Sequence, residues 1–182
     1  MRAWWADTKL DNPHTTVPKL SQLAFIAFAA ATSLASANEP VFREPHTFRL
    51  HLDKERYMEQ KVGKVPYVHN GAVYLFKNDN FGINLNVENG ALGEISYLPA
   101  ADKADVSLNF SQRINADGSS MMMLEIVNRT RYTLNLNALM VVPNSKGPAS
   151  TSILPVRPGL TNFETWPHPI TQLVLHKLTI QP

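Results

Sequence analysis

From Thr47 onward, apolar and polar residues alternate along the chain, and this period of two is what most constrains its fold. The alternation is clearest over residues 81–87, 106–111 and 132–138. A period of two places every second side chain on one face of a β-strand, which gives each strand one face for a core and one for water, as in antiparallel sheets. The pattern predicts an all-β protein, in which only residues 53–60 are expected to form a short surface helix.

Three segments that contain glycine predict hairpin turns, and the turns predict the register of the flanking strands. Residues 70–71 (Asn-Gly) fit a two-residue turn, whereas residues 88–90 and 116–118 fit three-residue loops that end in glycine. Each turn sets apolar residues opposite apolar residues, so the turn and the hydrophobic pattern support the same register. The expected pairs are Val68 with Val73, Ile83 with Ile95, and Phe110 with Leu124.

Many short strands separated by turns are typical of a β-sandwich or a β-barrel. In the last strand the apolar residues change face between Leu175 and Leu178, which predicts a β-bulge near Lys177. Prolines within and just after residues 151–156 place that strand at the edge of a sheet, where a missing N–H leaves no ladder hydrogen bond unmade. The expected strands lie near residues 47–53, 65–69, 72–77, 81–87, 91–98, 105–114, 119–128, 132–142, 151–156, 160–166 and 171–180.

The C-terminal half of the chain has a regular cadence of strands. One strand ends in Val-Asn-Arg-Thr at residues 127–130, the next begins with Tyr-Thr-Leu-Asn-Leu at residues 132–136, and a third follows a loop rich in Pro, Gly and Ser at residues 143–150. In this rhythm the chain resembles the immunoglobulin-like sandwiches that are common in bacterial envelope proteins, although the Cys–Trp–Cys hallmark is absent. The resemblance implies an antiparallel β-sandwich that is immunoglobulin-like in its C-terminal half and is preceded by a β-meander over residues 65–98.

Residues 20–37 form an apolar, Ala-rich run that follows Lys19 and ends in Ala35-Ser36-Ala37. This small-x-small ending is the pattern after which signal peptidases cut, and the run is too short and too weakly apolar for a typical membrane-spanning helix. We therefore expect cleavage after Ala37, no membrane span after cleavage, and a periplasmic or secreted protein.

Cleavage would divide the chain into an N-terminal extension with a signal peptide over residues 1–37 and a single β-sandwich domain over residues 38–182. The residues before the apolar run include charges and two tryptophans, which is unusual for a leader, so Met1 and Val17 are both candidate translation starts. The chain has no cysteine. This excludes disulfides, thiol catalysis and thiolate metal ligands, and it fits a bacterial envelope better than the disulfide-rich secreted domains of animals.

The formal net charge is only +2 at pH 7. Nucleic-acid-binding surfaces and polybasic membrane surfaces need clustered positive charge, so neither partner is expected. The sequence also contains no Gly-x-Ser-x-Gly motif and no glycine-rich phosphate-binding loop. We therefore expect neither catalytic activity nor a cofactor.

Three consecutive methionines lie at residues 121–123 in an expected strand. Met121 and Met123 share one face, whereas Met122 faces the core with Leu124. The outward pair could bind Cu(I) with help from a histidine, could form a patch that binds a partner, or could pack beneath a second layer. Because the histidines are scattered without metal-binding spacing, packing is favoured and no metal is expected.

Residues 163–170 hold the densest group of chemically active side chains, namely Glu164, Trp166 and His168, together with two prolines. An exposed Trp166 held by rigid prolines would anchor a partner protein, and Glu164 with His168 could act as an acid–base pair. The alternative is a stiff corner between strands, in which Trp166 plugs the end of the core. The corner is favoured, ahead of partner binding and then catalysis.

We therefore predict a binding or accessory module of the cell envelope whose partner is another envelope protein. The exposed edge at residues 151–156 would allow strand addition by that partner. Two alternatives stay open: a periplasmic copper carrier that uses methionine and histidine ligands, and a hydrolytic or carbohydrate-directed enzyme. The candidate partner-binding residues are Trp166, Glu164, His168, Met121 and Met123.

Overall fold

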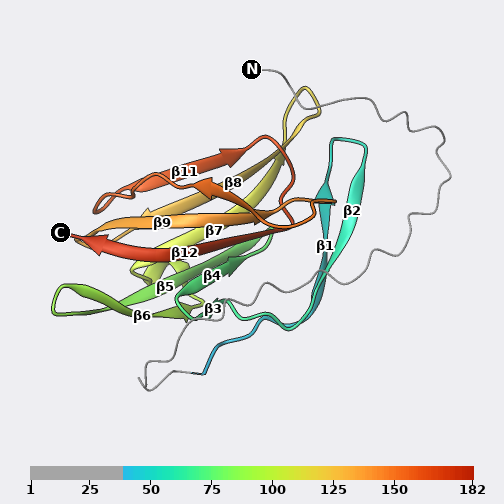
Figure 1. The fold of residues 1–182 in the computed structure, drawn as a ribbon. Helices are drawn as coiled ribbons and strands as arrows, with labels where there is room; N and C mark the ends of the chain where they lie inside the picture. Colours follow the sequence, from blue (N-terminus) through green and yellow to red (C-terminus); the bar gives the residue numbers. More distant parts are fainter. Residues whose placement is uncertain (1–38) are drawn as a thin grey trace.

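The computed structural model describes residues 39–182, which form a β-sandwich of two five-stranded sheets and a separate two-stranded hairpin (Figure 1). The predicted leader at residues 1–37 lies outside the described residues. All strand pairs are antiparallel, so the prediction of an all-β antiparallel sandwich is confirmed. The first sheet has the strand order β10-β9-β12-β4-β3, and the second sheet has the order β11-β8-β7-β5-β6.

Most strands lie within a few residues of the predicted segments, but β10 begins and ends earlier than the predicted 151–156, and β2 was not predicted. The first sheet contains β3 (Val68–His69), β4 (Ala72–Leu75), β9 (Thr133–Val141), β10 (Ala149–Ser152) and β12 (Gln172–Gln181). The second sheet contains β5 (Asp79–Glu88), β6 (Ala91–Leu98), β7 (Val106–Ile114), β8 (Ser120–Asn128) and β11 (Thr161–Trp166). The hairpin consists of β1 (His46–His51) and β2 (Tyr57–Val62), and a 3₁₀ turn, η1 (Ala101–Lys103), lies between β6 and β7.

One hydrophobic core lies between the two sheets. In β8, for example, Met122, Leu124 and Ile126 are buried while the residues between them are half-exposed. Strands from residues 65–98 and from residues 105–180 share this core, because β4 pairs with β12 and β5 pairs with β7. The expected meander is therefore not present as a unit: β3 and β4 belong to the first sheet, and β5 and β6 belong to the second.

Two of the three predicted hairpin registers are confirmed. Val68 pairs with Val73 beside the β3–β4 turn, and Phe110 pairs with Leu124 in the β7–β8 hairpin. In both hairpins the turn chemistry and the apolar pattern demand the same alignment, and a slip of one residue would turn every inward side chain outward.

The register of the β5–β6 hairpin differs from the prediction, because Ile83 lies opposite Tyr97 and not opposite Ile95. Asn89 and Gly90 both have positive φ angles, 52° and 79°, as a two-residue type I′ turn requires, so the loop is one residue shorter than expected. A bulge between Leu85 and Val87 shifts the register by one more residue in the same direction, so the total shift is two residues. The two changes together keep the inward side chains of both strands on the core face.

The predicted bulge in β12 is present. The pairing of β12 with β9 shifts between His176 and Thr179, and Lys177 between them has a φ angle of 52°. One extra residue at this point changes which side chains face inward, and this matches the change of face in the apolar pattern.

Residues 53–60 form a turn and the start of a strand, so the expected surface helix is wrong. The Asp53 carboxylate accepts hydrogen bonds from the backbone N–H groups of Glu55 at 2.9 Å and Arg56 at 2.7 Å, and β2 then begins at Tyr57. A short aspartate side chain that binds nearby N–H groups competes with the helical hydrogen bonds of the same backbone.

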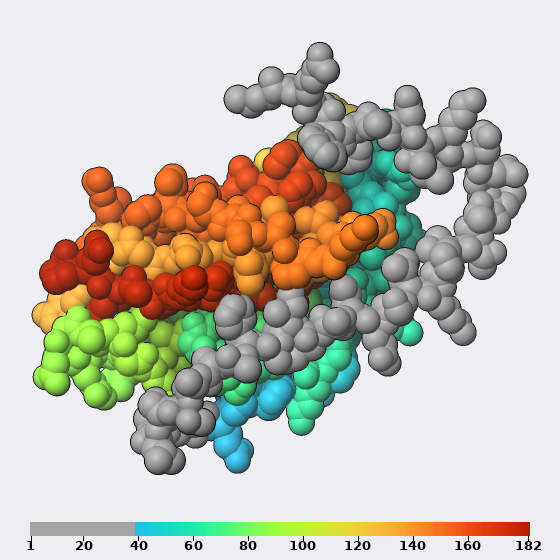
Figure 2. Space-filling view, in the orientation of Figure 1, coloured from blue at the N-terminus to red at the C-terminus, as the bar shows by residue number. Residues whose placement is uncertain are grey.

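The β1–β2 hairpin stands across one end of the sandwich (Figure 2). Gln112 of β7 holds it there, because its Oε1 accepts from the backbone N–H of His51 at 2.9 Å and its Nε2 donates to the His51 carbonyl at 2.8 Å. Phe48 and Leu50 of β1 are buried. The hairpin thus covers that end of the core.

Candidate functional site

Trp166 lies inside the protein, with only 6% of its surface exposed, and is therefore no exposed anchor. Its ring meets the ring of Phe110 edge to face at 6.4 Å, and its Nε1 donates to the hydroxyl of Thr151 at 3.1 Å. These contacts correspond to the corner alternative, in which Trp166 plugs the end of the core.

Glu164 and His168 share no hydrogen bond within residues 39–182. Glu164 Oε1 instead accepts from the backbone N–H of Leu154 at 2.9 Å and from Asn162 Nδ2 at 2.8 Å. The Nδ1 atom of His168 is buried and has no hydrogen-bond partner among the described residues. Glu164 thus stabilises the segment between β10 and β11. Glu164 and His168 do not form an acid–base pair.

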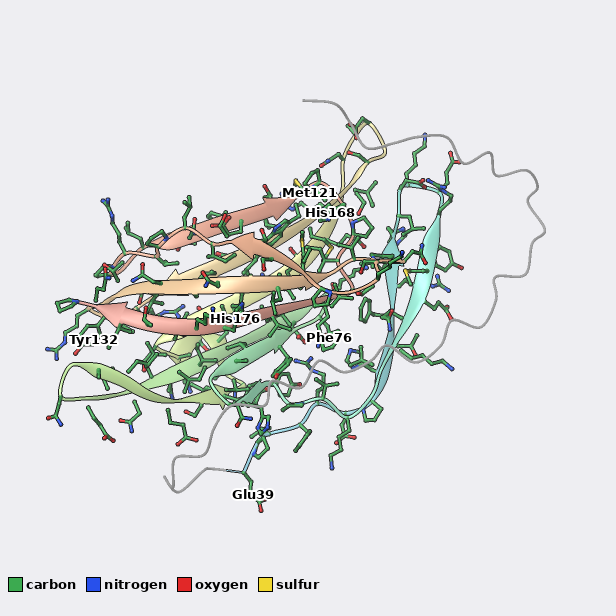
Figure 3. All side chains as sticks on the ribbon, viewed as in Figure 1. Glu39, Phe76, Met121, Tyr132, His168 and His176 are labelled. Carbon is green, nitrogen blue, oxygen red and sulfur yellow. The ribbon has the colours of Figure 1, made fainter. Side chains whose placement is uncertain are left out.

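Met121 and Met123 lie half-buried on the outward face of β8, whereas Met122 is fully buried. Figure 3 places Met121 and His168 at the same end of the sandwich. Within the described part of the chain, no group of three or more His, Asp or Glu side chains is arranged to hold a metal ion. Met121 and Met123 are both on the outward face, and copper binding by them stays a prediction.

The edge of the first sheet at β3 is covered by the N-terminal segment, residues 41–43. The backbone N–H of Tyr67 donates to the Val41 carbonyl at 3.0 Å, and the N–H of Arg43 donates to the Val65 carbonyl at 3.0 Å. Pairing of this kind removes the free backbone groups that a neighbouring chain would use.

The other edge of the first sheet, at β10, is the one for which strand addition was predicted. Side chains of β11 cover part of its open side: Leu154 donates its N–H to Glu164 and accepts from Asn162 Nδ2 at 3.3 Å. The prolines did mark a sheet edge correctly, since β10 pairs only with β9. Past Ser152, the backbone groups of Leu154 and Val156 are already hydrogen-bonded.

In the second sheet, the β6 edge is bent by the bulge in the β5–β6 hairpin and exposes Glu94. Bulges and charged side chains are two ways in which sheet edges avoid pairing. Tyr97 of β6 also stacks on Tyr67 at 4.1 Å, which joins the two sheets on this side. Burial, with Tyr67 beside it, raises the pKa of Tyr97 to about 12, so the phenol stays protonated at neutral pH.

Among residues 39–182, β8 is the one strand that pairs with β11, and no strand pairs with its outer edge. The backbone N–H of Asn128 donates to the Leu160 carbonyl at 3.0 Å, so Leu160 and every second residue after it face β8. The N–H and C=O groups of Thr161, Phe163 and Thr165 therefore point away from the sheet. No lysine, proline or bulge lies within β11, and Phe163 and Leu160 are 57% and 54% exposed.

The position of this open edge could not be read from the local pattern. Residues 160–166 were correctly predicted to be a strand, yet their place at the edge depends on the order of strands in the sheet, which is set by pairing with β8, over 30 residues away. The nearest signal in the sequence was Phe163, an aromatic residue a few positions after the turn at Pro158-Gly159.

Comparison with protein-family models, with curated proteins and with solved structures finds no match for this chain. Among residues 39–182 there is also no helix with the length and apolar character needed to cross a lipid bilayer.

Proposed function

We propose that this protein is exported to the periplasm or secreted, and that it acts there as a binding or accessory module of the cell envelope. Its partner is another envelope protein, which adds an extended segment to the free edge of β11. Strand addition of this kind takes its affinity from backbone hydrogen bonds and its specificity from alternate side chains.

The single observation that carries the proposal is the unprotected edge of β11. Proteins usually guard an exposed edge with lysine, proline, a bulge or a covering segment. Among the four edges of the two five-stranded sheets, as described over residues 39–182, β3 is paired with residues 41–43 and β6 has a bulge. At β10, Glu164 and Asn162 bind the backbone of Leu154 just past the end of the strand, whereas β11 has none of these features. Phe163 and Leu160 add exposed apolar surface beside the unpaired backbone.

The finer fold assignment belongs to the same proposal. We infer an immunoglobulin-like arrangement for the C-terminal half, and what supports it is that β8 and β9 lie in different sheets while β11 returns to pair with β8 and β12 pairs with β9. An experimental structure in which these strands connect differently would exclude this arrangement.

Site-specific photo-cross-linking in cells tests the partner. A cross-linking residue at Thr161, expressed in the full chain, should form an adduct with an envelope protein, while the same residue at Glu94 on the bent β6 edge should not. The proposal fails when both positions give the same adducts or when Thr161 gives none.

A proline at Thr165 tests the mode of binding. Thr165→Pro removes one outward N–H but no hydrogen bond to β8, and it should abolish the adduct, whereas Thr165→Val should retain it. Fluorescence of Trp166 reports whether each variant is folded. Persistence of the adduct in folded Thr165→Pro would argue for another surface.

N-terminal sequencing of the protein recovered from the periplasmic fraction or the medium tests export. The expected first residue is Asn38. A protein that stays in the cytoplasm with residues 20–37 attached would contradict the proposed location.

A further inference from the structure

The outward face of the second sheet carries a row of four residues in register across four neighbouring strands. Asn80 of β5 lies opposite Asn109 of β7, which lies opposite Glu125 of β8. Glu125 in turn lies opposite Phe163 of β11. Residues directly opposite each other share a face, and neighbouring strands are about 4.8 Å apart, so this polar row spans about 14 Å.

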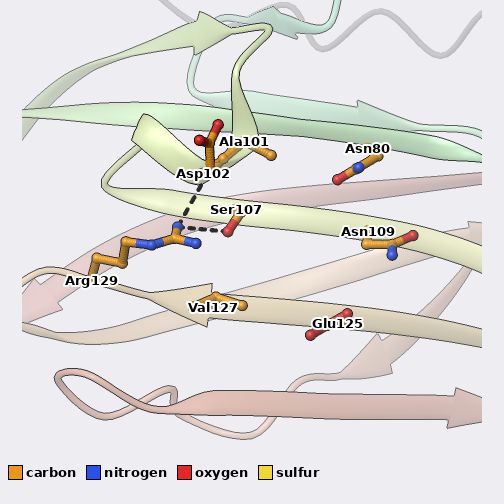
Figure 4. Close-up of a pocket in the computed structure, with 8 residues that line it drawn as sticks. All are labelled: Asn80, Ala101, Asp102, Ser107, Asn109, Glu125, Val127 and Arg129. Carbon is orange, nitrogen blue, oxygen red and sulfur yellow. Dashed lines mark hydrogen bonds between the residues drawn. The ribbon is translucent and has the colours of Figure 1, made fainter.

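The polar row runs along a surface pocket of about 230 Å³. Figure 4 shows Asn80, Asn109 and Glu125 one above another on three strands, at the open side of the sheet. None of these three side chains makes a hydrogen bond or ion pair with another residue in 39–182. Two amides and one carboxylate are therefore free to bind a ligand.

The opposite wall of the pocket is held rigidly. Arg129 Nη1 donates to the carbonyls of Ala101 at 3.2 Å and Ala104 at 3.3 Å and to the hydroxyl of Ser107 at 2.7 Å, which ties η1 to β7. Gly82 lets η1 approach, because a Cβ there would overlap the Cβ of Ala104. The pocket is thus preformed, and its ligand loses little free energy to ordering the protein.

The chemistry of the polar row selects among ligands. The amides of Asn80 and Asn109 both donate and accept, and Glu125 accepts, which suits a ligand whose groups are both donors and acceptors. The pocket is lined by two carboxylates, Glu125 and Asp102, and by one guanidinium, Arg129, whose Nη1 already donates to protein oxygens. The formal charge of this lining is therefore negative, which disfavours phosphates and nucleic acids. A peptide cannot add as a strand here, because β5, β7 and β8 are each paired on both sides.

We propose that the polar row binds an oligosaccharide. Asn80, Asn109 and Glu125 hydrogen-bond its hydroxyl groups, and the exposed ring of Phe163 stacks on the C–H face of one sugar. The length of the row suits several linked sugars rather than one. The two proposed sites share Phe163 but differ in the groups that carry them: the sugar binds the side chains of the polar row, whereas the added strand binds the outward backbone groups of β11.

An array of defined neutral and amino-sugar oligosaccharides, probed with the processed protein, tests the proposal. Glycans that bind are then measured by calorimetry. Asn109→Ala, Glu125→Ala and Phe163→Ala should each weaken binding by about tenfold or more, as expected for the loss of one well-placed contact. Ser111→Ala, on the same face of β7 but outside the polar row, is the matched control and should bind normally.

Two results would overturn the assignment: no binding to any oligosaccharide on the array, or binding that all three polar-row variants retain. Thr165→Pro separates this proposal from strand addition, because it should leave glycan affinity unchanged while abolishing the protein adduct. Loss of glycan binding in folded Thr165→Pro, with Glu125→Ala unaffected, would place the sugar at the β11 edge and contradict the polar row.

Discussion

The guanidinium of Arg43 lies 3.0 Å from the carboxylate of Asp79, and the two side chains are only 2% and 14% exposed. Arg43 also donates to the Tyr74 carbonyl at 2.9 Å and lies over the rings of Tyr67 and Phe76. Burial raises the pKa of Asp79, against the attraction of Arg43, and burial lowers the pKa of Arg43. This pair fixes the start of the described chain to the sandwich.

Removal of one partner of the Arg43–Asp79 ion pair should lower the free energy of unfolding. Arg43→Met leaves the Asp79 carboxylate buried without its counter-charge, so we expect a loss of about 3–5 kcal/mol in the free energy of unfolding. Arg43→Met combined with Asp79→Asn should recover most of the loss, because both charges are removed while an acceptor for the Phe76 N–H is kept. Urea unfolding followed by the fluorescence of Trp166 measures both, and a single-variant loss below about 1 kcal/mol would contradict the role assigned to the pair.

Ionisation of Asp53 should make the stability of the folded protein depend on pH in the acid range. Backbone hydrogen bonds from Arg56 and Glu55, with help from the Arg56 side chain, lower the pKa of Asp53 from 3.8 to about 2. Because the folded-state pKa is the lower one, the contribution is present above about pH 4 and is lost as the pH falls toward 2.

The comparison variant is Asp53→Asn, which cannot ionise. At pH 6 it should unfold at a lower urea concentration than the native protein, and the gap should narrow between about pH 4 and pH 2. A gap that stays constant with pH would show that the charge of Asp53 has no role in the turn.

Gly82 should not tolerate a side chain. A Cβ at this position would overlap the Cβ of Ala104, so Gly82→Ala should cost about 1–3 kcal/mol of stability. Adding Ala104→Gly should restore part of it, since that change removes the overlapping atom. Gly147→Ala, where nothing lies within 4 Å, is the control and should be close to neutral in the same urea titration.

Asn128 should be intolerant of an isosteric carboxylate. The side chain is fully buried, and its Nδ2 donates to the carbonyls of Tyr132, Val156 and Arg157 at 2.7, 2.9 and 3.2 Å. Asn128→Asp would turn an oxygen toward three carbonyl oxygens, so we expect destabilisation by about 3 kcal/mol or more. Asn115→Asp, in an exposed loop, should change the thermal midpoint little, and equal shifts for the two variants would contradict the prediction.

The alternating pattern was sufficient to predict antiparallel strands, because the burial of every second residue depends on strand geometry alone. It left a sandwich and a barrel both open, and the resemblance to immunoglobulin-like domains favoured the sandwich. Local turn chemistry was sufficient for the β7–β8 register, and the change of face between Leu175 and Leu178 was sufficient for the bulge at Lys177. Turn chemistry was not sufficient at Asn89-Gly90, where a three-residue loop and a two-residue turn both fit the sequence and the structure has the two-residue turn, followed by a bulge between Leu85 and Val87.

Local sequence likewise predicts only part of the polar row. The predicted β7–β8 register already set Asn109 opposite Glu125. Asn80 and Phe163 reach the row through β5 and β11, which are far away in sequence, and no local pattern records which strands become neighbours. The favoured corner at Trp166 follows from its apolar size and its prolines, whereas the engagement of Glu164 by Leu154 required the three-dimensional contact.

Within residues 39–182, the two five-stranded sheets have four edges: β3 is paired with residues 41–43, β6 has a bulge, β10 is contacted just past its end, and β11 has none of these features. Once a partner has paired with β11, the described sandwich sheets offer no second edge of this unprotected kind to another chain. Complexes made through β11 should therefore stop at two bodies, and the same asymmetry that invites a partner protects the protein from growing into fibres.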